Sequence, residues 1–270
     1  MTRLMMLAGG APTVGPELDP RPVVDDPVVM QMRPDGRRIG LLRVGPTGRD
    51  YTTIHEAMDE GYRMQAAKMA AEGVRTITPD YRVDILVDPG TYVDDWVPAL
   101  GTGLHVMAAN GQRSGALLRY PTAFAGLPSD AARGWSPGNL CWWEGIDVQT
   151  LKPTDGSLGP KYPAHGELNA GNTTHATCII TRCKLIPMGS EPGIGTNGGS
   201  AAMLVLHDVD VRGGTNNHGW DDKTMPLPMI NVFSKCTSNI GLGYSALSDT
   251  RADQVWIVDC VAPNLGSDGA

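Results

Sequence analysis

A pattern of apolar residues recurs at similar intervals through the second half of the sequence. It is anchored on Ile146, Cys183, Val209, Cys236 and Cys260, which are 37, 26, 27 and 24 residues apart. The residues three and five positions before each anchor, and two positions after it, are apolar or small with the exception of Asn231. Such alternation is typical of strands, and side chains that return at this interval are typical of a solenoid. Coils of this length predict a parallel β-helix.

The residue immediately before each anchor is of a different kind. These residues are Gly145, Arg182, Asp208, Lys235 and Asp259. The anchor and the apolar residue three positions before it are both expected to face inward, although they are an odd number of residues apart. In a regular strand, residues at an odd spacing point to opposite faces, so the chain is expected to bend between them. Cys183, Cys236 and Cys260 are then expected to stack as an interior ladder of small apolar groups, rather than as a metal site.

Composition agrees with short strands and excludes several function classes. The chain has 34 glycines and 21 prolines, and only 6% of its residues are aromatic, which favours strands joined by turns around an aliphatic core. A net charge of -7 argues against a nucleic-acid partner. The five cysteines lack zinc-type spacing, so buried free thiols are expected and no metal or cofactor. No segment approaches the roughly 18 apolar residues of a membrane helix, so no membrane partner is expected.

Before the repeats, the sequence predicts an arm and a helix. Residues 1–38 contain six prolines and are expected to form an extended arm, which wraps either its own domain or a neighbouring subunit. Residues 39–270 are expected to form one β-helix domain, with early strands at 39–44, 83–87, 104–109 and 115–120. A helix is predicted over 53–72, because Thr53 and Glu56 form a possible capping box and Gly73 is a natural stop.

Three segments carry distinctive motifs: "GRDYTTIHEAMDEG" (48–61), "VDILVDPGTYVDD" (83–95) and "HATCIITRCKLIP" (175–187). They resemble the pectin-lyase-like superfamily, and most nearly its pectinesterase-like branch. The resemblance implies an all-β fold, a single-stranded right-handed parallel β-helix with an N-terminal capping helix. It covers roughly residues 43–187, and the rest of the chain is similar only as generic coils.

The positions that carry catalysis in that family are empty in this sequence. Pectinesterases use two aspartates, as acid/base and nucleophile, whose pKa values must be pushed apart. Where the resemblance places the first, the chain reads "LIPMGSEPG", and where it places the second, "NGGSAAMLV". Asp94 replaces the glutamate of the Gly-x-Tyr-x-Glu turn. We therefore interpret the sequence as leaning against an enzyme.

A small set of polar and aromatic residues forms the candidate ligand site. It consists of Trp142, His218, Trp220, Asp221 and Asp222. Carboxylates beside a tryptophan face are typical of contacts with sugars, and a solvated loop with one anchoring tryptophan is the alternative. Trp142 and Trp143 are consecutive in one strand, so one of them is expected to face outward and to contact a sugar or another subunit.

These observations favour a non-catalytic structural or adhesion protein. The resemblance implies a bacteriophage virion component, such as a minor tail or capsid-decorating protein, assembled in the host cytoplasm. The expected partners are other virion subunits, bound through residues 1–38, and a host surface glycan; a homotrimer is one oligomeric state that the sequence leaves open. The alternatives are a pectinesterase- or pectate-lyase-like enzyme with a displaced active site, and a sugar-binding module without turnover.

Overall fold

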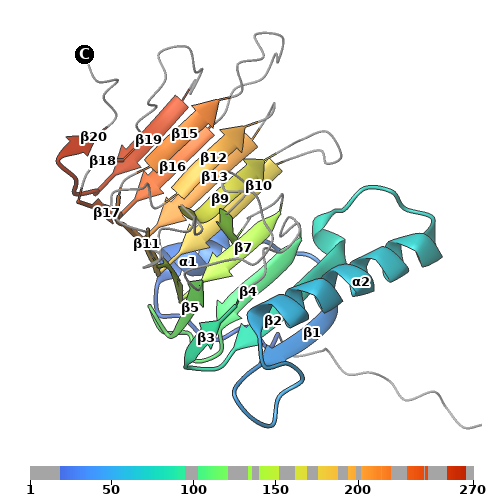
Figure 1. Ribbon diagram of the computed structural model, residues 1–270. Coiled ribbons are helices and arrows are strands. Elements are labelled where there is room, and N and C mark those ends of the chain that lie inside the picture. The colour runs from blue at the N-terminus through green and yellow to red at the C-terminus, as the bar shows by residue number, and fades with distance from the viewer. Residues whose placement is uncertain are drawn as a thin grey trace, which may run out of the picture.

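An eight-stranded parallel sheet is the largest sheet among the described residues. The computed structural model describes residues 19–94, 103–120, 133–135, 140–151, 162–168, 176–187, 194–198, 202–213, 215–219, 230–239, 241–242 and 254–265. In spatial order the sheet contains β1 (Arg38–Val44), β2 (Arg82–Val87), β4 (Leu104–Ala108), β7 (Cys141–Glu144), β10 (Ala176–Thr181), β13 (Ala202–His207), β16 (Ile230–Ser234) and β19 (Gln254–Val258). Neighbouring strands are parallel and follow one another from one end of the molecule to the other (Figure 1).

Three smaller sheets contain the other strands that the structure describes. A six-stranded sheet holds β3 (Thr91–Val93), β5 (Ala116–Tyr120), β8 (Ile146–Thr150), β11 (Lys184–Ile186), β14 (Asp210–Val211) and β17 (Thr237–Ser238). A four-stranded sheet holds β6 (Arg133–Trp135), β9 (Tyr162–Leu168), β12 (Ile194–Gly198) and β15 (Thr215–Gly219), and β18 (Gly241–Leu242) pairs with β20 (Asn264–Leu265). Their pairings are also parallel.

The predicted register between the repeats is confirmed. Cys141, Cys178, Leu204, Asn231 and Val255 were expected at equivalent positions, and each is the partner of the next across the eight-stranded sheet. The predicted bend is also confirmed. Gly145, Arg182, Asp208, Lys235 and Asp259 all have positive φ, between 52° and 70°. Four of them are not glycine, and this conformation is uncommon for such residues, which identifies the bend as a position imposed by the fold.

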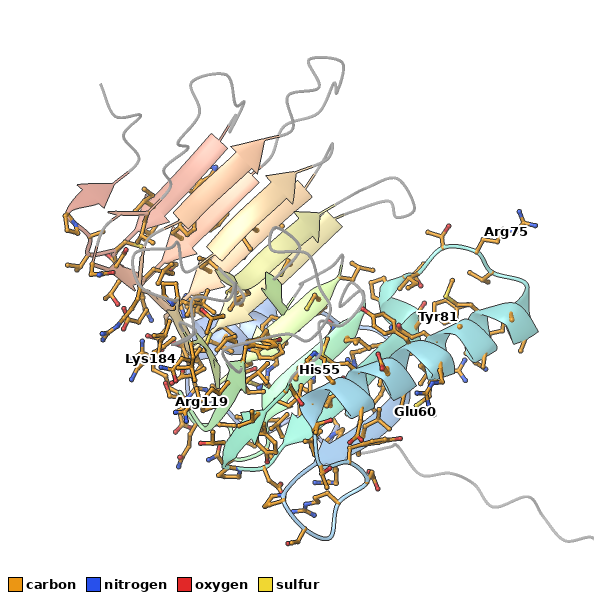
Figure 2. All side chains as sticks on the ribbon, in the orientation of Figure 1. His55, Glu60, Arg75, Tyr81, Arg119 and Lys184 are labelled. Atoms are coloured by element: carbon orange, nitrogen blue, oxygen red, sulfur yellow. The ribbon has the colours of Figure 1, made fainter. Side chains whose placement is uncertain are left out.

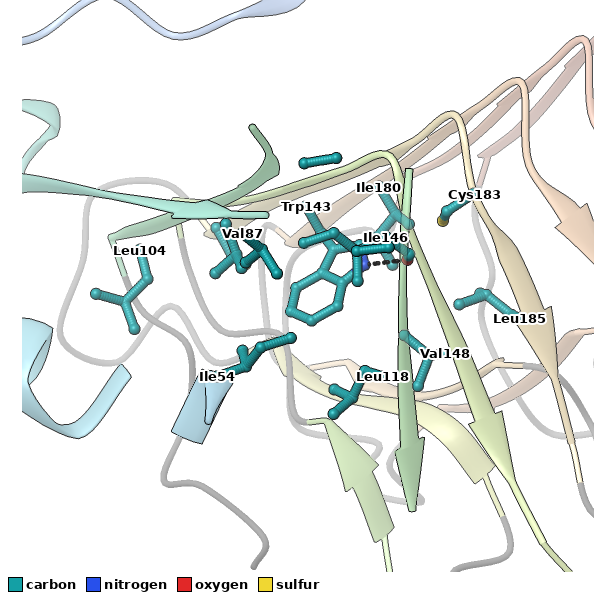
Figure 3. Packing of buried hydrophobic residues seen from close by; sticks show 14 of the residues in the cluster. Ile54, Val87, Leu104, Leu118, Trp143, Ile146, Val148, Ile180, Cys183 and Leu185 are labelled. Carbon is teal, nitrogen blue, oxygen red and sulfur yellow. Dashed lines mark hydrogen bonds between the residues drawn. The ribbon is translucent and has the colours of Figure 1, made fainter. Parts of the chain in front are cut away.

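The core lies between the sheets and is aliphatic, with few aromatic rings. In Figure 3 the Trp143 ring lies among side chains that include Ile54, Val87 and Ile146. Cys183 and Cys236 are fully buried in the same cluster, and the Cys236 amide donates to Cys260 Sγ at 3.4 Å. All five cysteines are free thiols; four are buried and Cys260 is partly exposed. Burial of small thiols in an apolar cluster is their ordinary structural role.

Two α-helices of the described residues pack beside the sheets. Helix α2 (Ile54–Glu72) begins with Thr53, whose side chain accepts a hydrogen bond from the Glu56 amide, and ends at Gly73 in the left-handed conformation. The helix predicted over 53–72 is therefore confirmed. Helix α1 (Pro27–Met32) is short, begins after the N-cap Asp26, and has a proline in its first turn, where the missing amide hydrogen costs no hydrogen bond. No helix in the described part of the chain is long and apolar enough to cross a membrane.

The predicted fold class, an all-β single-stranded right-handed parallel β-helix with an extended arm, is wrong. The described residues form an α/β-like arrangement of parallel strands in separate sheets, the two largest holding eight and six strands, with few helices. The sequence repeat specifies which residues of neighbouring strands lie opposite one another. It does not specify how the strands are grouped into sheets, so a correct register is compatible with a wrong fold class. The arm is not simply extended, because residues 27–32 are helical and Val24 and Val29 are buried against the outer face of the large sheet.

Candidate functional site

A pocket lined by arginines lies where the N-terminal segment (residues 19–37) meets the first two strands of the large sheet. It has a volume of about 450 Å³ and is lined by Asp19, Arg21, Asp35, Gly36, Arg37, Arg38 and Arg82. Four guanidinium groups face two carboxylates, so the lining carries a charge of four minus two, or +2. The whole chain has a net charge of -7, so the pocket is a positively charged region of a negatively charged protein.

Strand pairing and one glycine place these side chains. Arg38 and Arg82 begin β1 and β2 and are direct partners in the register, so their side chains are neighbours. Gly36 has a φ of 154°, and a Cβ at this position would lie 2.3 Å from the Pro79 carbonyl oxygen. The Arg37 amide donates to Asp80 Oδ1 at 3.1 Å. The loop that carries Arg37 is therefore held against the 3₁₀ turn η1 (Pro79–Tyr81).

Buried charged groups lie beneath the pocket. Asp84 is fully buried; its Oδ1 lies 2.9 Å from Arg82 Nε, and its Oδ2 lies 3.9 Å from Arg38 Nη1. Neither Asp84 oxygen accepts a hydrogen bond and Arg82 Nε donates none within the described part of the chain, because the close Nε–Oδ1 pair is poorly aligned. His105 Nδ1 is 3.8 Å from Asp84 Oδ1. The group is charged, enclosed and incompletely hydrogen-bonded.

Burial shifts both titratable groups toward their neutral forms. It raises the pKa of the Asp84 carboxyl to about 6, although the charges of Arg82, Arg38 and Arg21 act in the opposite direction. Burial also lowers the pKa of His105 well below its usual range, and the charge of Arg82 lowers it further. At neutral pH the site therefore holds an ionised Asp84 beside a neutral imidazole.

A second polar cluster fastens the N-terminal segment to the large sheet. Arg33 donates to both Glu144 oxygens, with distances of 2.9 Å to 3.2 Å, and to the Pro22 carbonyl oxygen at 2.9 Å. Trp142 Nε1 also donates to Glu144 Oε2 at 2.9 Å, and Arg182 Nη1 lies 3.6 Å from Oε1. Arg33 and Glu144 are almost fully buried. The cluster combines a charge pair with several hydrogen bonds, which is what a buried ion pair requires.

Asp26 connects the same segment to the end of β13 and to the turn after β16. Its side chain caps α1 by accepting from the Val28 and Val29 amides. Its Oδ2 lies 3.3 Å from Nε2 of the buried His207 and 3.6 Å from Lys235 Nζ. Partial burial acts to raise the pKa of Asp26, but the hydrogen bonds from His207 and from the helix amides outweigh it and leave the pKa below its ordinary value of 3.8.

Replacing Asp26 by alanine is expected to lower the free energy of unfolding by about 1–2 kcal/mol at pH 7, because the helix cap and the contact with His207 are lost together. A depressed folded pKa gives stability that is present above the unfolded value and is lost as pH falls through the folded one. The difference from wild type should therefore shrink as pH falls below 3.8. Urea unfolding from pH 7 to 3 measures it. Asp25→Ala, at the exposed neighbouring residue, should change little at any pH; an equal effect of both variants would contradict this role.

A buried His–Asp pair lies at the start of α2. His55 Nδ1 is 3.2 Å from Asp94 Oδ2, and both side chains are nearly inaccessible. The Tyr120 ring centroid is 6.1 Å from that of His55. Burial, together with the charge of Asp94, raises the pKa of Tyr120 well above its usual range. Figure 2 shows His55 at the end of α2 that lies against the strands, with Arg75 beyond the opposite end. Asp94, which the resemblance aligned with a turn glutamate, thus contacts the core.

The structure buries one member of the candidate ligand site. Trp142 points to the outer face of the sheet and Trp143 to the core, as alternation predicted, but both are completely buried, so the expected exposed tryptophan contact is wrong. The reason is that the N-terminal segment covers the outer face of the sheet, where Trp142 packs with Val24 and Val29. His218 lies in β15 and pairs with Asn197. Trp220, Asp221 and Asp222 lie outside the described residues.

Metal-binding clusters are also missing from the described part of the chain. It contains no group of three or more His, Cys, Asp or Glu side chains that could hold a metal ion. Asp208 and Asp210, on neighbouring positions of the repeat, each have a basic neighbour instead: Asp208 Oδ1 lies 3.3 Å from Arg113 Nε, and Asp210 accepts from Arg212 Nε at 3.1 Å.

The last strand of the large sheet leaves an apolar edge exposed. In the described ranges β19 has β16 on one side and no strand on the other. Trp256 is 59% exposed, Val258 50% and Val261 70%. Trp256 pairs with Val232 and so extends the same outward-facing row as Trp142, Ile179 and Val205, beyond the part that the N-terminal segment covers.

Comparison with known proteins adds no relative to this picture. The chain matches no protein-family model and no curated protein.

Proposed function

We propose that the chain is a non-catalytic structural or adhesion protein that works within a larger assembly. The observation that carries this proposal is strand β19, which within the described residues has no neighbouring strand on one side and bears the exposed Trp256 and Val258, with the exposed Val261 just after it. An unpaired strand edge is a template for association, and proteins normally protect it with charge, proline or a covering segment. Contiguous exposed apolar residues, a tryptophan among them, are typical of surfaces that meet another protein.

The fastening of residues 19–37 supports the same proposal. The buried Arg33–Glu144 ion pair and the contacts of Asp26 with His207 and Lys235 hold this segment on its own sheet, so the arm's described part stabilises the subunit. Assembly contacts are then assigned to the β19 edge. The narrower assignment is to a bacteriophage virion component, either a minor tail or a capsid-decorating protein. It follows from the sequence resemblance combined with the absence of the aspartates that this resemblance would require.

Purified protein is expected to associate through β19 as its concentration rises, and Trp256→Lys should weaken that association about tenfold or more, since a charge replaces a central aromatic contact. Sedimentation velocity over a range of concentrations measures the effect. Val93→Lys is the matched control, because Val93 is 58% exposed but lies on β3, away from this edge. Wild-type protein that stays monomeric throughout would contradict the proposal, and so would turnover of pectin or polygalacturonate by the purified chain.

A further inference from the structure

We propose that the arginine pocket between the N-terminal segment and strands β1 and β2 binds an oxyanion, namely the phosphate or carboxylate group of a small molecule or glycan. This goes beyond the proposed structural function, which requires no such ligand. The pocket offers four guanidinium groups, from Arg21, Arg37, Arg38 and Arg82. Guanidinium groups are planar forks that match phosphate and carboxylate oxygens with two parallel hydrogen bonds.

The pocket keeps a positive charge that favours an anion, even though some of its arginines are paired with aspartates of the protein. Arg21 is engaged by Asp19, to which its Nε donates at 2.6 Å, and Arg82 lies beside Asp84. The lining itself carries four arginines against Asp19 and Asp35, four minus two, or +2; Asp84 and Asp80 lie outside the lining, beside Arg82 and the Arg37 amide. An anion that enters would be attracted at short range, although the chain as a whole is negative and would repel it at long range.

The buried groups beneath the pocket point to the same ligand. Arg82 lines the pocket, is only 6% exposed, and its Nε donates no hydrogen bond within the described part of the chain. This Nε atom is shielded from solvent and lies 2.9 Å from Asp84 Oδ1 in a misaligned pair, so Asp84 neutralises Arg82 without satisfying it fully. A ligand oxygen in the pocket would meet the part of the Arg82 side chain that lines it and add a charge-assisted contact.

The arginines are held in position before any ligand binds. The Pro34 carbonyl oxygen accepts from Arg21 Nη1 at 3.3 Å and from Arg82 Nη1 at 3.5 Å, and so joins the segment to β2. Gly36 lets the loop pass close to Pro79. Such preorganisation reduces the entropy lost on binding. Acidification should strengthen binding, because protonation of Asp84 removes one negative charge; Arg82, Arg38, Arg21, Asp19 and His105 are the other charged or titratable groups that face it.

Isothermal titration calorimetry with inorganic phosphate and with glucuronate, at constant low ionic strength, tests the proposal. Arg37→Gln should weaken binding about tenfold, because one charge-assisted contact is lost. Arg37 is exposed, so this variant is expected to fold. Arg63→Gln is the control, since Arg63 is an exposed arginine on α2 that pairs with Glu60 outside the pocket.

The outcomes separate the ligand sources and leave the proposal open to contradiction. Binding of phosphate alone would assign a phosphorylated ligand, and binding of glucuronate alone an acidic sugar; either supports the pocket if Arg37→Gln weakens it and Arg63→Gln does not. Binding that is equal in both variants, or no binding of either probe, would overturn the proposal. These measurements use dilute protein, so their outcome is independent of association through the β19 edge.

Discussion

Replacing Arg33 by methionine is expected to lower the free energy of unfolding by about 3–5 kcal/mol, the usual range when one partner of a buried ion pair is removed. Glu144 would lose its main partner in a site where its side chain is 2% exposed. It would retain the Trp142 indole donor and Arg182 at 3.6 Å, but lose the guanidinium that contacts both its oxygens. Urea unfolding followed by tryptophan fluorescence measures the change.

Two further variants show whether the loss comes from the unpaired charge. Arg63→Met removes an ion pair of the same chemistry from the exposed surface of α2, where such pairs contribute about 0–0.5 kcal/mol. The double variant Arg33→Met/Glu144→Leu removes both charges and should recover much of the stability that Arg33→Met loses. If Arg33→Met were no more destabilising than Arg63→Met, the N-terminal segment would not be fastened by this pair.

The loss should also be visible at Trp142. The indole is buried because residues 19–37 cover the outer face of the sheet, and Arg33 is the strongest polar attachment of that segment. Release of the segment would expose Trp142 to water while Trp143, on the other face, stayed in the core. A shift of tryptophan emission to longer wavelength before global unfolding is therefore the expected signature in Arg33→Met.

The strand register and the ends of α2 could be predicted from the sequence, because both depend on short, recognisable residue patterns. The spacing of Cys141, Cys178 and Leu204 predicted the register, and Thr53 with Gly73 predicted both ends of α2. In each case the decisive interactions link residues at repeated or nearby positions. The repeat did not specify the grouping of strands into separate sheets, so the predicted fold class was wrong.

Long-range contacts were not predictable in the same way. Alternation correctly placed Trp142 and Trp143 on opposite faces, but only the fold brings Val24 and Val29 over Trp142. The arginine pocket was missed for the same reason, since it joins residues near 20, 37 and 82 that no local pattern connects. The only signal was the pair Arg37–Arg38 and the single Arg82, each just before a predicted apolar strand.

Trp143→Ala is expected to destabilise the protein by about 3–5 kcal/mol, because a fully buried indole is replaced by a cavity at the centre of the core. The ring packs between the large sheet, the six-stranded sheet and the start of α2. Its Nε1 donates to the Ile146 carbonyl oxygen at 2.7 Å, directly across the bend at Gly145. The side chain thus contributes both apolar contact and the hydrogen bond that closes this turn.

Two further variants, Trp143→Phe and Trp256→Ala, separate the contribution of the hydrogen bond from that of burial. Trp143→Phe keeps most of the ring but leaves the Ile146 carbonyl without its side-chain donor, so a loss of about 1–3 kcal/mol is expected. Trp256→Ala removes the same side chain from the same sheet at a position that is 59% exposed, and in dilute protein it should cost less than about 1 kcal/mol. Equal losses for Trp143→Ala and Trp256→Ala in chemical denaturation would mean that the space between the sheets is not the core on which folding depends.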